Sequence, residues 1–212
     1  MPGFFQTADD KNGLTPLEGF PVELREGTLS AVVSTDELSS VIFLHSLLAG
    51  AGGKAYVIAQ GRRVSPRLIE RLDGDPAGVL VGFAYSSGEL ITGLSQIPPG
   101  SLLVVSDFPY IRGVGNDAVL EIRRMTDKKG LITVLHHEAM TFNELNPEGE
   151  FERLFYAPGL FDLLLVLRTS SYRGHYRLNI TILKAPPEDF LAVGDHSIPV
   201  DGLLRKLKGQ AP

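Results

Sequence analysis

Residues 28–60 constrain the fold of this chain more than any other segment. They begin with an apolar run at residues 29–33, which leads into a short polar turn at residues 34–37. Apolar residues then recur at helical spacing over residues 38–48, and a glycine-rich stretch ends the helix. A second apolar run at residues 55–59 completes a strand–turn–helix–strand unit. In α/β proteins the turn of such a unit is where phosphate-binding loops lie.

Apolar runs and helical patterns alternate through the rest of the chain. The near-continuous apolar run at residues 101–107 is typical of a parallel strand buried on both faces. Residues 139–160 are polar and are expected to form an irregular insertion. Further strands are expected at residues 78–84, 131–135, 161–168 and 176–184, and helices at residues 67–72, 86–94 and 117–128.

The last two strands flank a polar turn and predict an antiparallel hairpin. The fold class is therefore expected to be α/β, with a mostly parallel sheet flanked by helices and a C-terminal antiparallel hairpin. A chain of 212 residues suits one sizeable α/β domain. We divide it into an N-terminal extension at residues 1–27, a core domain at residues 28–190 and a C-terminal tail at residues 191–212.

The composition of the chain excludes several kinds of chemistry and indicates a cellular compartment. The formal net charge of −5 gives no global basic field for nucleic acid. Cysteine is absent, which excludes disulfides, thiol nucleophiles and cysteine-ligated zinc. The sequence has neither a signal-peptide pattern nor an apolar stretch of the ~20 residues that a membrane helix needs. We expect a cytoplasmic protein without a membrane partner.

Four stretches, at residues 14–21, 57–68, 102–107 and 131–137, follow the order and spacing of one family's motifs. They resemble the lead-in sequence, the Ser-Pro helix start, the Walker B strand and the sensor strand of RecA-like ATPases. Within that superfamily they resemble the archaeal RadA and RadB recombinases and their paralogues. The resemblance covers residues 14–190 and implies a RecA-like fold of the P-loop type.

The polar turn departs from the family's Walker A pattern. With Gly53-Lys54 placed on the family's Gly-Lys pair, the Walker A lysine falls at Leu38 and the preceding glycine at Glu37. A phosphate loop needs glycines for close backbone approach and a lysine for charge. Asp36 and Glu37 would instead repel a phosphate. The family's catalytic carboxylate falls at Gln60, whose amide cannot act as a general base.

Few parts of the ATPase site therefore remain. Ser39 matches the Mg²⁺-binding hydroxyl, Asp107 ends the Walker B strand and His137 lies at the sensor position. His136 and His137 should point to opposite faces of their strand, which makes them poor partners for a metal. Because of these departures from the family pattern, we expect no catalytic residue, no cofactor and no metal. The degenerate nucleotide site comprises Ser34, Thr35, Asp36, Glu37, Leu38, Ser39, Gln60, Asp107 and His137.

Two further segments are candidate binding elements. Phe5 and Ala8 resemble the F-x-x-A segment by which recombinases of this family dock onto a neighbouring core, and a disordered N-terminus is the alternative. Nucleic-acid contacts are assigned to the basic side chains of the hairpin, Arg168, Arg173, Arg177 and Lys184. The acidic residues of the 139–160 segment would oppose phosphate contacts there.

These features favour a non-catalytic recombinase paralogue that acts as an interaction or regulatory protein in DNA repair or recombination. Its expected partners are RecA-like proteins, in a homo- or hetero-oligomer, with DNA a weaker candidate. Three alternatives remain open. They are a nucleic-acid-binding module without ATPase activity, a P-loop enzyme with a divergent nucleotide site, and a Walker-less ring subunit similar to those of the Elongator RecA-like hexamer.

Overall fold

A computed structural model describes residues 13–60 and 64–210. The strands are β1 (Gly13–Leu14), β2 (Leu24–Arg25), β3 (Leu29–Ser34), β4 (Ala55–Ala59), β5 (Val79–Phe83), β6 (Leu102–Ser106), β7 (Ile132–Glu138), β8 (Leu163–Tyr172), β9 (His175–Lys184) and β10 (Gly194–Pro199). The α-helices are α1 (Glu37–Ala49), α2 (Pro66–Arg71), α3 (Ser87–Gln96), α4 (Asn116–Lys129), α5 (Pro147–Phe155) and α6 (Asp201–Lys208). The short 3₁₀ helices are η1 (Pro76–Gly78), η2 (Phe108–Tyr110), η3 (Pro158–Leu160) and η4 (Pro187–Ala192).

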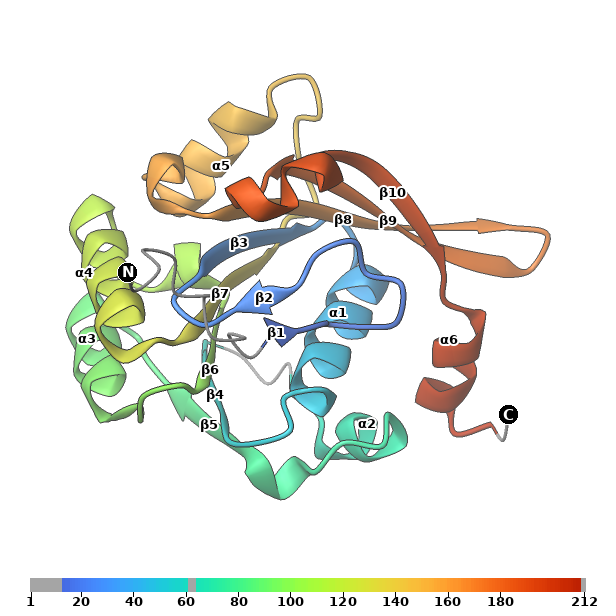
Figure 1. The fold of residues 1–212 in the computed structure, drawn as a ribbon, viewed down its shortest axis with the longest axis horizontal. Coiled ribbons are helices and arrows are strands. Elements are labelled where there is room, and N and C mark those ends of the chain that lie inside the picture. Colours follow the sequence, from blue (N-terminus) through green and yellow to red (C-terminus); the bar gives the residue numbers. More distant parts are fainter. Residues whose placement is uncertain (1–12, 61–63, 211–212) are drawn as a thin grey trace, which may run out of the picture.

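One eight-stranded sheet crosses the molecule in the order β10-β9-β8-β3-β7-β6-β4-β5 (Figure 1). The six strands from β8 to β5 are parallel, and β9 and β10 extend the sheet as antiparallel strands. Strands β1 and β2 form a separate two-stranded antiparallel sheet. The predicted α/β class, the mostly parallel sheet and the terminal hairpin are confirmed.

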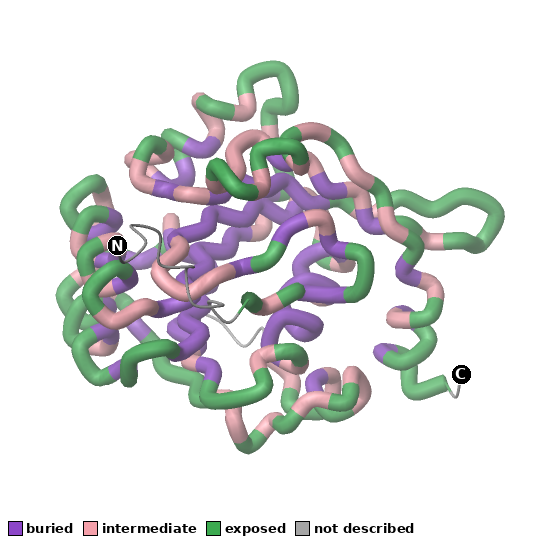
Figure 2. The backbone as a smooth tube through the Cα atoms, viewed as in Figure 1, coloured by how far each residue is buried: buried purple, intermediate pink, exposed green. Residues whose placement is uncertain are grey.

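Two hydrophobic cores lie on opposite faces of the sheet, because successive side chains of a strand alternate between faces. Val32 of β3 joins the core beneath α1, α2 and α6, whereas Ala31 and Val33 join the core beneath α3, α4 and α5. Figure 2 shows the buried residues running through the central strands. Burial on both faces explains why β3 and β6 are apolar along almost their whole length.

The segments at the two ends of the described chain complete the core on the α1 side. Leu17, Phe20 and Leu24 from the lead-in segment are buried there, and the rings of Phe20 and Phe43 lie 6.0 Å apart. From the other end, Leu204 and Leu207 of α6 pack into the same core.

The expectation of an irregular insertion at residues 139–160 is wrong, since this segment contains α5. Asn146 caps the helix by accepting a hydrogen bond from the Gly149 N–H at 3.2 Å, and Pro147 occupies the first turn. Phe151 and Phe155 then lie on one buried face of α5. A proline just inside the start and apolar residues four apart are sequence signals of a helix.

Phe155 is fully buried, so a substitution at this residue tests the packing of α5. Its ring centroid lies 5.7 Å from that of Phe151, 5.9 Å from that of Phe161 and 6.4 Å from that of Phe108. We predict that Phe155→Ala lowers the free energy of unfolding by about 3–5 kcal/mol in urea denaturation, because it leaves a cavity. Phe190, which is 69% exposed, provides the control: Phe190→Ala should change stability by less than about 0.5 kcal/mol. Equal effects of the two variants would contradict the packing of α5.

Candidate functional site

The carboxyl ends of four adjacent strands gather most of the predicted nucleotide-site residues at one edge of the sheet. Strand β7 lies between β3 and β6, and β4 follows β6. The chain leaves β3 through α1 toward β4, on one side, and leaves β7 through α5 toward β8, on the other side. The crevice at such a reversal is the usual ligand position in open α/β sheets. We therefore take these strand ends as the candidate site.

Asp36 closes the turn between β3 and α1. Its Oδ1 accepts a hydrogen bond from the Ser39 N–H at 2.8 Å and so caps α1. The same carboxylate accepts two bonds from Thr169 of β8, from the N–H at 2.7 Å and from the hydroxyl at 2.7 Å. The amide at the start of α1 thus already has an anionic partner within the chain.

These hydrogen bonds also stabilise the charged form of Asp36. Burial alone would raise the pKa of this carboxyl group, but the bonds from Thr169 and Ser39 outweigh it and lower the pKa below the ordinary value of 3.8. Asp36 is therefore ionised at neutral pH. A negative charge is fixed where a phosphate would have to approach.

The remaining residues of the turn also serve the fold. The Thr35 N–H donates to the Leu167 carbonyl at 2.9 Å, and the Ser39 hydroxyl donates to the Asp36 carbonyl at 2.8 Å. Leu38, at the Walker A lysine position, packs against the core on the α1 side. The predicted Mg²⁺-binding hydroxyl and the predicted lysine position are thus both used in local structure.

A buried polar pair lies beneath α1. Ser34 Oγ is 3.0 Å from His136 Nε2, and both residues are fully buried. The rings of Phe43 and His136 stack with their centroids 6.1 Å apart. Sequence analysis assigned the sensor role to His137, yet His136 is the histidine that contacts the β3 end.

His137 faces the opposite side of β7 and approaches Asp107. His137 Nδ1 lies 3.4 Å from Asp107 Oδ1, and both side chains are almost completely buried. Asp107 has a left-handed backbone with φ of 58°, which turns the chain out of β6 into η2. From η2, Tyr110 packs edge-on against His137 at 5.1 Å. The predicted Walker B and sensor positions are thus in contact with each other.

A cavity of about 380 Å³ borders this edge beside α1. Glu37 and Glu138 line it, as does His45. His45 Nδ1 donates to the Val41 carbonyl at 2.8 Å, while Nε2 accepts from the Ser65 N–H at 3.0 Å. Burial lowers the pKa of His45, although the bond to Val41 opposes the effect, so the ring is neutral at pH 7. The acidic lining disfavours an anionic ligand here.

Gln60 follows the end of β4, next to the β6 strand end that Asp107 follows. Its Nε2 lies 3.5 Å from the Ala84 carbonyl, on the side of β5. Residues 61–63, which follow it, lie outside the described part of the chain, as do Phe5 and Ala8 of the predicted docking segment.

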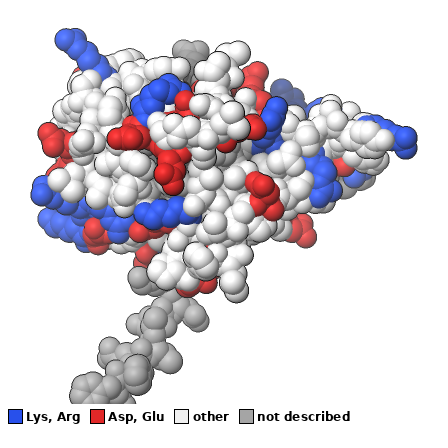
Figure 3. Space-filling view, turned by 90° about the horizontal axis from the view of Figure 1, so that it is seen from above, with Lys and Arg blue, Asp and Glu red and all other residues white. Residues whose placement is uncertain are grey.

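The basic residues of the hairpin contact the protein itself. Arg168 donates to Glu144 at 2.9 Å, Arg177 donates to the Ser197 hydroxyl at 2.8 Å, and Lys184 donates to the carbonyls of Gly159 and Phe161. At the hairpin turn, Arg173 stacks over Tyr172 at 5.1 Å. In Figure 3 basic and acidic side chains are interspersed over the face seen from above. Of these four predicted nucleic-acid contacts, Arg168 has an acidic partner, whereas Arg177 and Lys184 are hydrogen-bonded to neutral groups.

Sequence analysis missed the exposure of β5. This strand lies at one edge of the sheet and pairs only with β4 among the described strands. Leu80 is 46% exposed, Val81 45% and Phe83 53%, so apolar side chains face solvent on both sides of the strand. Edge strands usually carry charges, prolines or bulges that prevent pairing with other chains. The apolar and uncharged β5 edge is instead typical of an interaction surface.

The chain matches no protein-family model, and no curated protein matches it. Within residues 13–60 and 64–210, no three metal-ligating side chains group closely enough to hold a metal ion. No helix in the described part of the chain is long and apolar enough to cross a membrane.

The contacts of Asp36 predict that its contribution to the free energy of unfolding depends on pH. Asp36→Ala should lower the free energy of unfolding by about 2–3 kcal/mol at pH 7, because α1 loses its cap and the Thr169 N–H loses its partner. The folded-state pKa is lowered, so this stabilisation is complete above the unfolded pKa of 3.8 and is lost as the pH falls through the folded value. Urea denaturation from pH 7 to pH 3 measures the difference.

Ser86→Ala is the matched control. Ser86 caps α3 through its hydroxyl, which accepts from the Glu89 N–H at 3.3 Å and does not ionise. The loss in free energy of unfolding caused by Ser86→Ala should not depend on pH. If the loss in free energy of unfolding caused by Asp36→Ala is equally independent of pH, the role given to the carboxylate is refuted.

Proposed function

We propose that this chain is a RecA-like domain that has lost nucleotide chemistry and acts as an interaction or regulatory subunit in DNA repair or recombination. The observation that carries this proposal is the Asp36 carboxylate, which occupies the start of α1 and ties it to β8. In a P-loop the corresponding amides bind phosphate. Here a phosphate would have to displace a carboxylate that already accepts three hydrogen bonds.

The arrangement of the sheet supports the RecA-like assignment. The Walker B and sensor positions proposed from sequence, Asp107 and His137, lie side by side on neighbouring strands, and the sensor strand separates the Walker B strand from β3. The antiparallel strands follow the parallel core, as the resemblance implies. This strand order and the contact between Asp107 and His137 support the proposal.

The charges near the turn support the same conclusion. Glu37 and Glu138 line the neighbouring cavity, and Asp36 is held in its ionised form. Any one of these charges could be offset by a bound cation. Without the Walker A lysine, however, the site offers no basic side chain at the position that normally neutralises the β- and γ-phosphates.

Nucleotide binding is the direct test of the closed turn. We predict that 1 mM Mg-ATP or Mg-ADP leaves the melting temperature unchanged, with no saturable heat in calorimetric titration. A ligand present at 100 times its Kd would stabilise the fold by about 2.7 kcal/mol and would be easily detected. A shift that disappears in Asp107→Asn would overturn the proposal and restore the enzyme alternative.

The exposed β5 edge supports an interaction role. Unpaired N–H and C=O groups of an edge strand can accept an added strand, while neighbouring apolar side chains provide contact area. The Phe5–Ala8 resemblance suggests the complementary element, namely an N-terminal segment of a second RecA-like chain. The nucleic-acid alternative has less support, because Arg168, Arg177 and Lys184 are each bonded within the protein.

Association is tested by sedimentation velocity of the full chain, alone and with a RecA-like partner from the same cell. Val81→Lys places a charge on the β5 edge. We predict that it raises the Kd of the complex at least tenfold, so that smaller species predominate. Phe5→Glu should have the same effect through the complementary segment. Leu120→Lys is the control, since Leu120 is 38% exposed but lies on α4. Unchanged association in both edge and segment variants would exclude this mode of docking.

A further inference from the structure

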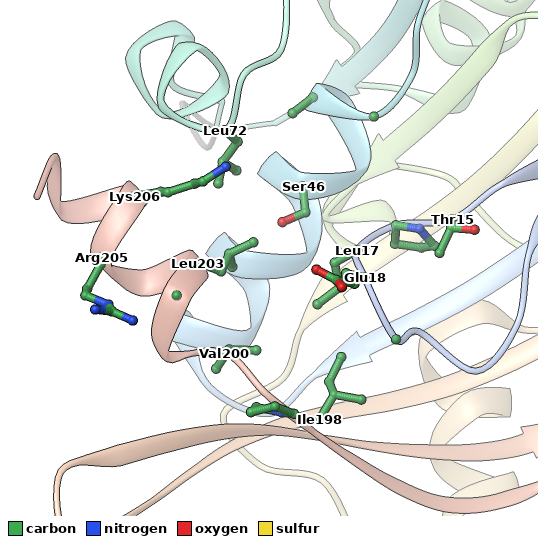
Figure 4. A pocket seen from close by; sticks show the side chains of 16 residues that line it. Thr15, Leu17, Glu18, Ser46, Leu72, Ile198, Val200, Leu203, Arg205 and Lys206 are labelled. Carbon is green, nitrogen blue, oxygen red and sulfur yellow. The ribbon is translucent and has the colours of Figure 1, made fainter. Parts of the chain in front are cut away.

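A large cavity lies away from the candidate nucleotide site. It has a volume of about 860 Å³, within the range of small-molecule binding sites. Figure 4 shows it between α1 and α6, with the lead-in segment and the end of β10 closing the other sides. Most of its wall is apolar, and the side chains that line it include Leu17, Leu72, Ile198, Pro199, Val200 and Leu203.

One hydroxyl group on the wall of this cavity lacks a hydrogen-bond partner. Ser46 of α1 is only 6% exposed, and its Oγ bonds to no other group among the residues that the structure describes. The hydroxyl of a helical serine commonly donates to the carbonyl four residues earlier, but that of Ser46 does not. Figure 4 shows this hydroxyl directed from α1 toward α6, across the cavity. Because a buried polar group without a partner is unfavourable, a ligand atom that bonds to Ser46 would be stabilised there.

The charges around the cavity disfavour a charged ligand. Three charged residues of the described chain, Glu18, Arg205 and Lys206, line the cavity, and all three are exposed. Lys206 pairs with Asp73 at 2.6 Å, and Arg205 lies on the face of α6 turned away from the cavity in Figure 4. The first turn of α6 carries Asp201, which would repel an anion there. A charged group on the apolar wall would therefore leave water without a buried partner of opposite charge, which is unfavourable.

We propose that this cavity binds a small, uncharged and mainly apolar molecule that carries one hydroxyl group. The apolar body would lie against Leu17, Ile198 and Leu203, and the hydroxyl group would bond to Ser46 Oγ. A hydroxyl group suits this position because it can either donate to the serine hydroxyl or accept from it. The site is separate from the β3–α1 turn and from the β5 edge, so binding here would not depend on the interaction role proposed above.

Naphthol is a suitable probe, because it combines an uncharged aromatic body with one hydroxyl group. We predict that the native protein binds naphthol saturably in equilibrium dialysis, with one site per chain. Naphthalene sulfonate and naphthylmethylammonium, which carry a negative and a positive charge on the same ring system, should bind at least tenfold more weakly. Absence of saturable naphthol binding, or tighter binding of either ion, would overturn the proposal.

The position of the site is tested by filling the cavity. Leu203→Trp places a larger side chain on the cavity wall and should weaken naphthol binding at least tenfold. Leu120→Trp is the matched control, since Leu120 is 38% exposed and lies on α4, which covers the opposite face of the sheet. It should leave the affinity unchanged. Binding that is kept in Leu203→Trp, or lost equally in Leu120→Trp, would overturn the proposal.

The hydrogen bond to Ser46 has its own test, in which naphthalene serves as the probe without a hydroxyl group. Ser46→Ala should weaken naphthol binding about fivefold, as expected for one lost hydrogen bond, while naphthalene binding stays the same. Because this variant removes only one oxygen atom, it tests the site even if Leu203→Trp does not fold.

Ser95→Ala is the matched control for Ser46→Ala. The Ser95 hydroxyl donates to the Thr92 carbonyl at 2.7 Å on α3, on the other side of the sheet, so its loss should change the binding of neither probe. Unchanged naphthol binding in Ser46→Ala, or an equal loss for naphthol and naphthalene, would show that Ser46 does not bond to the ligand, and the proposal would fail.

Discussion

The hydrogen bonds of Asp36 fix the first turn of α1 against β8, in addition to the strand pairing that already joins β8 to β3. Through one carboxylate, the end of β3, the first turn of α1 and the middle of β8 are fixed relative to each other. β3 is central to the sheet, with β7 on one side and β8 on the other. The position of β8 in turn sets the antiparallel extension through β9 and β10. A single charged side chain therefore fixes α1 to the parallel strand on which the antiparallel extension is built.

The contact between Asp36 and Ser39 is one of several in which polar groups near the β3–α1 turn bond within the chain. The strand–turn–helix unit has a buried strand and an apolar helix, while the Ser39 amide in the first turn of the helix is bonded to Asp36. Polar residues at the neighbouring strand ends are likewise turned inward: Ser34 contacts His136, and Asp107 approaches His137. By contrast, the apolar surface of β5 and the large cavity beside α6 are open. The surfaces available for binding are therefore those whose side chains take no part in these internal hydrogen bonds.

The sequence predicted features that depend on local pattern. The apolar runs located the parallel strands, and Ser-Pro and glycine signals located most helices, because burial and capping leave marks within a few residues. Features that depend on sheet order could not be predicted in this way. The run at Val79–Phe83 looks like any buried strand, and only its place at the sheet edge exposes Leu80 and Val81. Similarly, the charge of Asp36 was evident, but its bonds to Thr169 join residues 133 positions apart.

The packing of α6 has a consequence for how the chain reaches its folded state. Leu204 and Leu207 pack into the core on the α1 side, the Lys206 ammonium group pairs with Asp73, and Arg71 donates to the Leu207 carbonyl at 2.5 Å. The core on the α1 side is thus complete only when α6 is packed against α2 and β9. During synthesis from the N-terminus, the core on the α3 and α4 side can form first, whereas its counterpart stays incomplete until α6 has left the ribosome. The order of translation therefore makes the α1 layer the last to close.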